Sequence, residues 1–424
     1  MKQYSFLLVL FMALCFGIGN GNKAQAGSLQ TRGVWVSCFE FEELGLKDKT
    51  EAQFRANANK IFATIRANGC NTVYFHVRAY DDAIYPSSVT GFSKYMSSDG
   101  KAPGYDPLKI LVSLAHSHKL KIHAWMNPYR VSSKKILDPA KQTTTSRIVS
   151  QVKEIISRYA VDGVHFDDYF YPQNIKKYKK VPAVTRRKNV NMMVRKVYQT
   201  VKQKKKSLKF GISPAGDIPY CEKIGADVRT WLSQSGYVDY VIPQIYWSNN
   251  YIMNGKKTAL FKERLAKWRE INKRDVPMYV GLALYKTGCS LKEDPGWKKS
   301  SGNIASQIRL IRSGNTEGYV FFAYKDLIRS GAAKELKKYY KVIGKISLNK
   351  KKKTLRAGKK YRLKASFWPA KLHGKIKWKS SNKKIASVSK KGVVKAKKKG
   401  TVRIYAIYGT MKKSCKIVVK KKRK

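Results

Sequence analysis

Acidic residues are scarce in this 424-residue chain. Asp and Glu number 26 against 88 Lys and Arg, and the formal net charge is +62. Residues 345–424 contain 31 Lys and Arg and no acidic residue. A charge of this size and sign attracts polyanions. We therefore expect residues 345–424 to bind an anionic polymer by charge rather than in a shaped pocket. A general lysine bias of the source proteome is the alternative explanation.

Cysteine is scarce as well. The six cysteines are widely spaced, and no C-x-x-C pair occurs. This spacing argues against a disulfide framework and against a zinc site. Cys15 lies in an N-terminal apolar run, and we interpret the other five as mostly buried thiols. Neither a metal ion nor an organic cofactor is predicted.

Long apolar runs are absent beyond the N-terminus. Lys2, the apolar run at 6–18 and the small residues Ala24 and Ala26 are typical of a secretory signal. The run is too short to anchor a protein stably in a bilayer. We therefore predict a signal peptide at residues 1–26 and a secreted, cell-wall-associated monomer without a membrane span. An exported protein meets anionic wall polymers rather than nucleic acid, so a wall polymer is the expected anionic partner.

Residues 27–343 alternate between strand-like and helix-like patterns. Strands are predicted at 32–39, 71–78, 120–126, 164–166, 208–213, 238–244, 277–283 and 318–323, and helices at 51–68, 107–118, 147–159, 186–203, 226–235, 260–271, 304–312 and 332–340. Eight strand–helix units in succession predict a closed (β/α)8 TIM barrel of the α/β class. A doubly wound open sheet is the competing fold, but no Gly-rich phosphate loop follows any of these strands.

Residues 344–424 show a different pattern. Short alternating runs are separated by turn residues, and no helical period is present. This pattern predicts a small all-β, antiparallel Ig-like sandwich that ends in a basic tail. The two patterns together predict two domains that meet near residue 343.

Two adjacent carboxylates end the strand predicted within V-D-G-V-H-F-D-D-Y-F-Y-P at 161–172. Side chains of a strand alternate between its faces, so His165, Asp167 and Tyr169 share one face and Asp168 takes the other. Asp-Asp at a strand end is also common as a helix cap or a turn. In a (β/α)8 barrel, however, the active site is built at the C-terminal ends of the strands. We therefore predict Asp167 and Asp168 as the catalytic residues.

The carboxyl group that works together with Asp167 stays open at this point. Asp168, Asp82 and Asp217 each follow a predicted strand end, and Glu40 is next in order. Catalysis by a pair of carboxyl groups needs one protonated acid and one ionised carboxylate as nucleophile or base. Asp167 is the first choice for the nucleophile or base.

Polar and aromatic residues on neighbouring strands and loops are predicted to face the same site. Flat rings can stack on sugar rings, and the polar groups can bond to hydroxyls or to a carboxylate. The predicted substrate-binding residues are Arg78, Asp82, His123, Trp125, Asn127, Tyr129, Arg130, His165, Tyr169, Gln244, Tyr246 and Trp247, with Tyr171 as a further ring. Aromatic platforms beside paired carboxylates predict a glycoside hydrolase.

Seven motifs occur in barrel order. They are R-G-V-W-V at Arg32, N-T-V-Y-F-H-V-R at Asn71, D-A-I-Y-P-S at Asp82, H-A-W-M-N-P-Y-R at His123, D-G-V-H-F-D-D-Y-F-Y-P at Asp162, I-S-P at Ile212 and D-Y-V-I-P-Q-I-Y-W at Asp239. On these motifs the chain resembles glycosyl-hydrolase-like family 10 of bacterial envelopes. The resemblance implies cleavage of peptidoglycan glycan strands. It also implies a looser link to enzymes of the amylase type, in which a D-G-x-x-x-D pattern on the fourth strand places the nucleophile, here on Asp167.

The C-terminal segment has motifs of its own. They are L-R-A-G-K-K-Y-R-L-K-A at Leu355, W-K-S-S-N-K-K-I-A-S-V at Trp378 and G-V-V-K-A-K-K-K-G-T-V at Gly392. This segment resembles the group 2 bacterial Ig-like domains. The resemblance implies a spacer or adhesion module in which Trp378 packs in the core.

Two other functions compete with glycan hydrolysis. F-D-D also occurs in metal-dependent polysaccharide deacetylases, in which the second Asp and two His bind a divalent ion. The available His116 and His118 lie on a predicted helix away from the strand ends, so this ligand set looks incomplete. The third possibility is a carbohydrate-binding or adhesion protein that holds glycan without cutting it.

Overall fold

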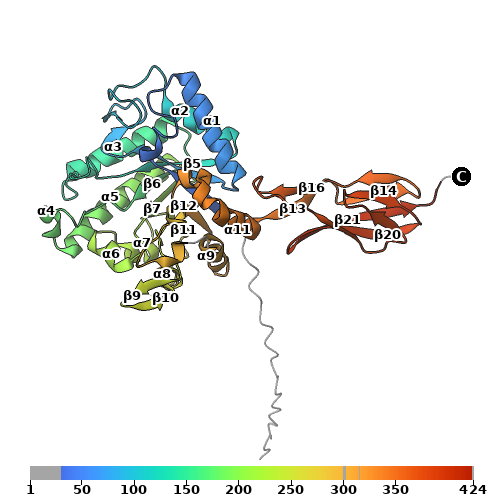
Figure 1. Ribbon diagram of the computed structural model, residues 1–424. Helices are drawn as coiled ribbons and strands as arrows, with labels where there is room; N and C mark the ends of the chain where they lie inside the picture. The colour runs from blue at the N-terminus through green and yellow to red at the C-terminus, as the bar shows by residue number, and fades with distance from the viewer. Residues whose placement is uncertain (1–29, 299–301, 315, 423–424) are drawn as a thin grey trace, which may run out of the picture.

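The computed structural model describes residues 30–298, 302–314 and 316–422. The predicted signal peptide lies outside these residues. Within them, no helix is both long enough and apolar enough to cross a bilayer. Figure 1 shows a helix-covered barrel joined through its last helix to an elongated all-β domain.

Eight parallel strands form the barrel, as predicted. They are β1 (Thr31–Val36), β2 (Thr72–Arg78), β5 (Lys121–Met126), β6 (Gly163–Asp167), β7 (Lys209–Ser213), β8 (Tyr240–Val241), β11 (Tyr279–Leu282) and β12 (Gly318–Phe321). They follow the order β11-β12-β1-β2-β5-β6-β7-β8. Bridges from Val241 to Met278 and from Gln244 to Gly281 join β8 to β11 and close the barrel.

Helices surround the barrel. The main ones are α1 (Glu51–Ala67), α2 (Pro107–Ser117), α3 (Gln142–Arg158), α5 (Ala183–Lys204), α6 (Ile218–Lys223), α7 (Val228–Ser233), α8 (Leu260–Ile271), α9 (Asn303–Arg312), α10 (Tyr324–Ile328) and α11 (Ala333–Ile343). A short α4 (Lys176–Lys179) and the strand pairs β3 (Asp82–Ala83) with β4 (Gly91–Phe92) and β9 (Tyr251–Met253) with β10 (Lys256–Thr258) lie in the connections. Apolar side chains on the outer faces of the strands pack under these helices in one continuous core.

Three boundaries differ from the prediction for local reasons. Strand β8 is short because Pro243 has no N–H to donate to a neighbouring strand. The helix predicted at 226–235 is the shorter α7, and α6 before it was not predicted; Asp217 caps α6, and Gly225, with φ +93°, separates it from α7. Helix α3 begins five residues early because Thr144 and Thr145 are buried, and packing outweighs their weak helix propensity.

The barrel interior is filled by aromatic rings and two neutral histidines. Tyr240 Oη lies 2.9 Å from His123 Nδ1 and 3.3 Å from His165 Nδ1. Trp35 Nε1 donates to His165 Nε2 at 3.2 Å. Burial is the main cause that lowers the pKa of His123 to about 4 and that of His165 well below its ordinary value. Both rings are therefore uncharged parts of the core.

The C-terminal domain is an all-β sandwich with its own core. A four-stranded sheet consists of β14 (Lys352–Arg356), β21 (Met411–Lys420), β20 (Gly400–Tyr408) and β17 (Lys377–Ser380). Opposite it lie β15 (Lys360–Arg362), β19 (Val393–Ala396) and β18 (Ala386–Val388), while β13 (Lys345–Leu348) pairs with β16 (Ala365–Trp368). The sandwich was predicted to be antiparallel, but β14 and β21 pair in parallel. This pairing is possible because most of the domain lies between them and forms the crossover that parallel strands need.

The C-terminal domain packs against the barrel beside the starts of β1 and β2. Lys371 N donates to Ala67 O at 3.2 Å, and the Arg32 guanidinium lies 4.9 Å from the centre of the Trp368 ring. This is the N-terminal end of the strands, so the C-terminal domain lies away from the end where a barrel active site is built.

Candidate active site

A pocket of about 180 Å³ opens at the C-terminal ends of the barrel strands. Its lining consists of Trp35, Ser37, Phe39, His76, Trp125, Asn127, Arg130, Asp167, Asp168, Ser213, Gln244, Tyr246 and Phe322. Two wider surface grooves, of about 400 and 580 Å³, bring no pair of carboxylates together. The pocket at the strand ends is therefore the candidate active site.

The two carboxyl groups of Asp167 and Asp168 both line this pocket. Strand β6 ends at Asp167, so the alternation of faces stops there and does not turn Asp168 away as the sequence predicted. Tyr169 N donates to Asp167 Oδ1 at 3.3 Å. Gln244 Nε2 donates to Asp168 Oδ1 at 3.4 Å and to Ser213 O at 2.8 Å. The two carboxyl groups thus accept hydrogen bonds from different residues.

Both carboxyl groups hold their protons more tightly than an exposed aspartate. Burial raises the pKa of Asp167 to about 7, and the negative charge of Asp168 adds to the rise. Burial likewise raises the pKa of Asp168 to about 6, while the hydrogen bond from Gln244 opposes it. Burial thus brings the pKa values of both carboxyl groups toward neutral pH, the range in which a carboxyl group works well as a general acid or base.

A stacked pair of rings lies beside the carboxyl groups. The His76 and Trp125 rings are parallel within 7°, with centroids 3.8 Å apart. Burial is the main cause that lowers the pKa of His76 to about 3, so the imidazole is neutral. Because Cys38 N donates to His76 Nδ1 at 3.4 Å, the ring proton is on Nε2. His76 thus presents an N–H donor at the pocket.

Four pocket residues have a buried polar atom without a hydrogen-bond partner of normal geometry in the described chain. These atoms are His76 Nε2, Trp125 Nε1, Asn127 Oδ1 and Arg130 Nε. The His76 side chain interacts loosely with that of Asn127, and the Trp125 indole with Asp167. Loosely paired buried polar groups in a pocket are suited to bind a ligand. Donors and an acceptor beside flat rings match the hydroxyl groups and faces of a sugar.

Arg130 lies between two tyrosine rings at the pocket. Its guanidinium carbon is 4.8 Å from the centre of the Tyr80 ring and 4.1 Å from that of Tyr169. Tyr169 is absent from the pocket lining, so the structure places it against Arg130 rather than beside the substrate. These cation–π contacts hold Arg130 in position.

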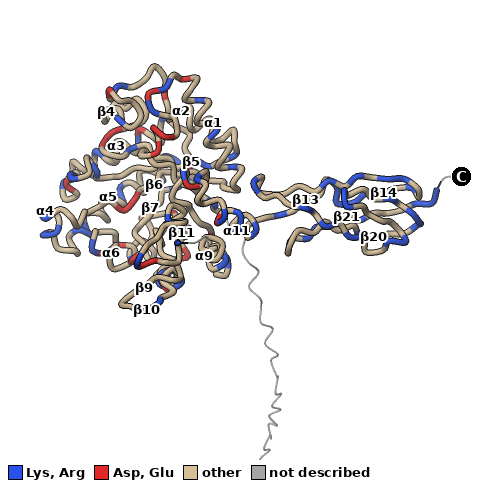
Figure 2. Tube along the Cα trace, in the orientation of Figure 1, with Lys and Arg blue, Asp and Glu red and all other residues tan. Residues whose placement is uncertain are grey.

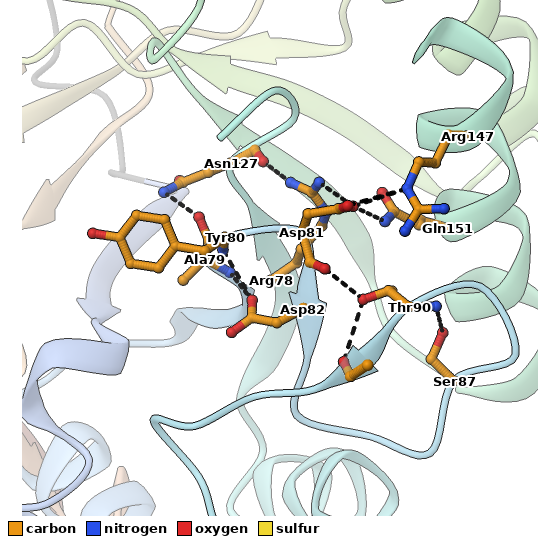
Figure 3. Close-up of polar contacts among 11 residues, drawn as sticks. Arg78, Ala79, Tyr80, Asp81, Asp82, Ser87, Thr90, Asn127, Arg147 and Gln151 are labelled. Carbon is orange, nitrogen blue, oxygen red and sulfur yellow. Dashed lines mark hydrogen bonds and ion pairs between the residues drawn. The ribbon is translucent and has the colours of Figure 1, made fainter. Parts of the chain in front are cut away.

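Arg78 and Asp82 were predicted to bind substrate, but the structure directs both into the supporting loop (Figure 3). Arg78 is buried and donates to the Asn127 carbonyl oxygen and, at 2.8 Å, to Asp81 Oδ1. Asp82 Oδ1 accepts hydrogen bonds from Ala79 N and Tyr80 N at 3.0 and 2.9 Å. Neither side chain lines the pocket, because Asp81 and the backbone N–H groups of Ala79 and Tyr80 hold them in the loop after β2.

This network also orients a pocket residue. Asn127 Nδ2 donates to Ala79 O at 3.2 Å, which leaves its Oδ1 at the pocket. Asp81 in turn accepts from Arg147 Nε at 3.1 Å and from Gln151 Nε2 at 2.9 Å. Arg78 is thus a positioning residue for Asn127.

Five further predicted residues are absent from the pocket lining. His123 and His165 lie deeper in the barrel. Alternation along a strand predicts the face on which a side chain lies but not its depth along the barrel axis, so the sequence could not exclude them. Tyr129 is fully buried against Phe170, with ring centroids 6.1 Å apart. Tyr171 is buried, and its hydroxyl accepts from Asn189. Trp247 packs over Gly216, where a β-carbon would clash with its ring.

Asp217 and Glu40 also lie outside the pocket lining and have structural partners. Asp217 caps α6 and is 2.6 Å from Arg264. Glu40 is buried, which raises its pKa to about 7, and it accepts from Ser37 N and Lys325 N at 2.8 Å. Asp167 and Asp168 remain as the carboxyl groups that line the pocket.

Six pocket residues were absent from the predicted site. They are Trp35, Ser37, Phe39, His76, Ser213 and Phe322. All lie at or near the ends of β1, β2, β7 and β12. The rule that identified Trp125 and Gln244 would have found most of them if it had been applied to all eight strands.

The residues that a metal-dependent deacetylase would need are dispersed. No group of three or more His, Cys, Asp or Glu residues suited to a metal ion occurs in the described part of the chain. His116 Nε2 bonds to Asp162 Oδ2 at 3.0 Å, and His118 Nε2 to Asn59 Oδ1 at 2.7 Å. Asp162 precedes β6, so His116 lies at the opposite end of the barrel from the pocket.

Several known glycoside hydrolases are similar to this chain. Glycosyl hydrolase YngK of Bacillus subtilis strain 168 is 30% identical over 360 residues, which cover 70% of this chain and 69% of that protein. Glycosyl hydrolase DigH of Escherichia coli strain K12 is 32% identical over 353 residues, covering 66% and 78%.

Solved structures share the barrel fold. The PgaB (BpsB) glycoside hydrolase domain from Bordetella bronchiseptica has a TM-score of 0.51 at 11% identity, covering 72% of this chain and 98% of that one. The endo-1,4-beta-mannanase from Rhizomucor miehei has a TM-score of 0.51 at 9% identity, covering 74% and 94%.

Family models match both domains. The bacterial Ig-like domain (group 2) model matches residues 343–419, and the glycosyl hydrolase-like 10 model matches residues 30–142 and 130–299. Together with the relatives, these matches show that the chain is a glycoside hydrolase and belongs to the glycosyl hydrolase-like 10 family.

Proposed function

We propose that this glycoside hydrolase is secreted and cleaves a bacterial cell-wall glycan, with peptidoglycan glycan strands as the first candidate. One observation carries the proposal: two partly buried aspartates with raised pKa values share a pocket lined by rings and by polar atoms without a hydrogen bond of normal geometry. This is the equipment for protonating a glycosidic oxygen and stabilising or attacking the sugar carbon.

The two carboxyl groups take different roles in this proposal. The hydrogen bond from Gln244 Nε2 favours the ionised form of Asp168, so Asp167 keeps the proton of the pair and acts as the general acid on the leaving oxygen. Asp168, ionised and bonded to Gln244, acts as the base or nucleophile. The resemblance implied the nucleophile on Asp167, and this assignment exchanges the two roles.

Product masses distinguish the three possible functions. Purified full-length protein is incubated with intact peptidoglycan and with denuded glycan strands, and the products are analysed by mass spectrometry. Hydrolysis shortens the strands and adds one water per cut, whereas deacetylation removes acetyl groups without shortening, and binding alone changes no mass. We expect shortened strands, with or without a chelator. Acetyl loss that stops on adding chelator would establish a deacetylase instead.

The C-terminal domain supports attachment to an anionic wall polymer. Figure 2 shows basic residues along this domain and no acidic ones. Exposed charges are screened over about 8 Å at physiological salt, so charge-driven binding weakens as salt rises. Co-sedimentation with walls, before and after removal of their anionic polymers and at low and high salt, tests the attachment. Equal retention under all four conditions would contradict it.

A further inference from the structure

A groove of about 580 Å³ crosses the C-terminal domain. Its lining consists of Arg362, Leu363, Lys364, Ala365, Lys375, Ile376, Trp378, Lys390 and Lys391. Five of these side chains are basic and exposed. Trp378 packs against the core of the domain, as the resemblance implied, and is only partly buried, so it also lines the groove. The groove thus combines an aromatic ring with a concentrated positive charge.

A tight turn builds one side of the groove. Gly392 N donates to Ser389 O at 3.0 Å, and Leu363 N donates to Gly392 O at 3.0 Å. Gly392 has φ +78°, and a β-carbon there would lie 2.5 Å from Leu363 O and 2.9 Å from the Trp378 ring. The turn, the ring and the neighbouring strand are therefore in fixed contact, and Lys390 and Lys391 lie within the turn at the groove.

The charge of the groove has no internal counterpart. Residues 345–422 contain no acidic residue, and none of the five basic side chains forms an ion pair in the described chain. Like charges gathered around one groove repel each other, and a bound anion relieves this repulsion. The groove therefore favours an anionic ligand.

We infer that this groove is a binding site for a linear glycan that carries carboxylate or phosphate groups. Trp378 would stack on a sugar ring while the basic side chains pair with its anionic groups. The inference rests on the proposed glycan-directed function, because the same chain has a sugar-cleaving domain. It goes beyond attachment by diffuse charge, since it assigns the contact to one groove.

A matched pair of charge variants tests the site. The groove variant is Arg362→Gln/Lys390→Gln/Lys391→Gln. The control variant is Lys352→Gln/Arg403→Gln/Lys416→Gln, whose residues are exposed neighbours on the four-stranded sheet. Each variant loses three positive charges from the same domain, so diffuse attraction weakens equally in both.

Binding of the full-length chain to fluorescent oligogalacturonate is measured by anisotropy. We expect the groove variant to weaken binding at least about tenfold and the control variant less than about threefold, since each surface charge pair contributes little alone. Polyglutamate, which has charge without sugar rings, and neutral dextran should both bind more weakly than oligogalacturonate. Both variants should cleave soluble glycan strands at the wild-type rate.

Three results would overturn the inference. Equal weakening by the two variants, or equal binding of polyglutamate and oligogalacturonate, would leave only diffuse charge. Tighter binding of a single-stranded oligonucleotide than of oligogalacturonate, lost in the groove variant, would assign the groove to nucleic acid. If the wild-type chain bound glycan but did not cleave it, the proposed hydrolysis would be refuted and the inference about the groove would still hold.

Discussion

Replacing Asp167 by Asn should remove activity and make the barrel more stable at alkaline pH. An amide can neither give nor accept the catalytic proton, so we expect turnover to fall at least about a thousandfold. The side chain keeps its size, and the pocket keeps its shape. Stability rises because the wild-type protein must hold an ionised carboxyl in a partly buried position.

The direction of the stability change follows from the direction of the pKa shift. Folding raises the pKa of Asp167 from 3.8 to about 7, so the folded chain binds this proton more tightly than the unfolded chain. Wild-type stability therefore falls as pH rises from about 4 to about 7, and then stays level. The Asn variant lacks this loss. The stability gain of the Asn variant over the wild type should be absent near pH 4 and complete near pH 8.

The pKa shift of Asp167 sets an upper bound on the gain in the free energy of unfolding. A rise of about three pH units corresponds to about 4 kcal/mol. We expect about 1–2 kcal/mol, because the two adjacent carboxyls titrate as a pair and the hydrogen bond from Tyr169 N to Asp167 is weakened in the variant. Urea unfolding at pH 4 and pH 8 measures the difference.

Asp162→Asn is the control. Asp162 lies at the other end of the same strand and accepts from Ile122 N at 2.9 Å. This substitution should cost about 1 kcal/mol and leave turnover unchanged. Near-wild-type turnover of Asp167→Asn, or a stability gain at pH 4 and none at pH 8, would refute the reasoning.

Three further predictions concern the same pocket, its support and the second domain. Asp168→Asn should lower turnover at least about a hundredfold. It also removes a negative charge that raises the pKa of Asp167, so the remaining activity should decline at a lower alkaline pH than that of the wild type. A pH–rate profile with an unmoved high-pH limb would contradict this. Arg78→Met should cost about 3–5 kcal/mol in urea unfolding because it leaves Asp81 without its buried partner. Arg147→Met is the comparison: this side chain is 38% exposed, so the substitution should cost less than about 1 kcal/mol. Equal losses of stability in the Arg78 and Arg147 variants would contradict the role of Arg78 as the buried partner of Asp81. Wall binding should weaken steeply as salt rises, and salt-independent co-sedimentation would exclude an electrostatic attachment.

The fold was largely predictable because its signals are local. Alternation along strands, the helical period and the caps are properties of neighbouring residues, so the eight units and the change of pattern near residue 343 could be read directly. Where the predicted boundaries were wrong, a local effect outweighed the pattern. Pro243 shortens β8, and burial of Thr144 and Thr145 extends α3.

The site was only partly predictable, because it depends on depth and on the paths of loops. Strand-end position was enough to select Asp167, Trp125 and Gln244, which do meet in the pocket. The same rule could not place His165 in a deeper layer, since successive side chains on one face look equivalent until the strands stagger into a barrel. Nor could it show that the loop after β2 turns Arg78 toward Asp81.

The sequence by itself thus determined the two architectures, the excess of positive charge and the carboxyl pair, because each is written in consecutive residues. Only the tertiary structure decided which residues share the pocket. Ser37 and Phe322 are nearly three hundred positions apart and become neighbours when β12 pairs with β1. The raised pKa values were decided there too, since burial by distant parts of the chain produces them.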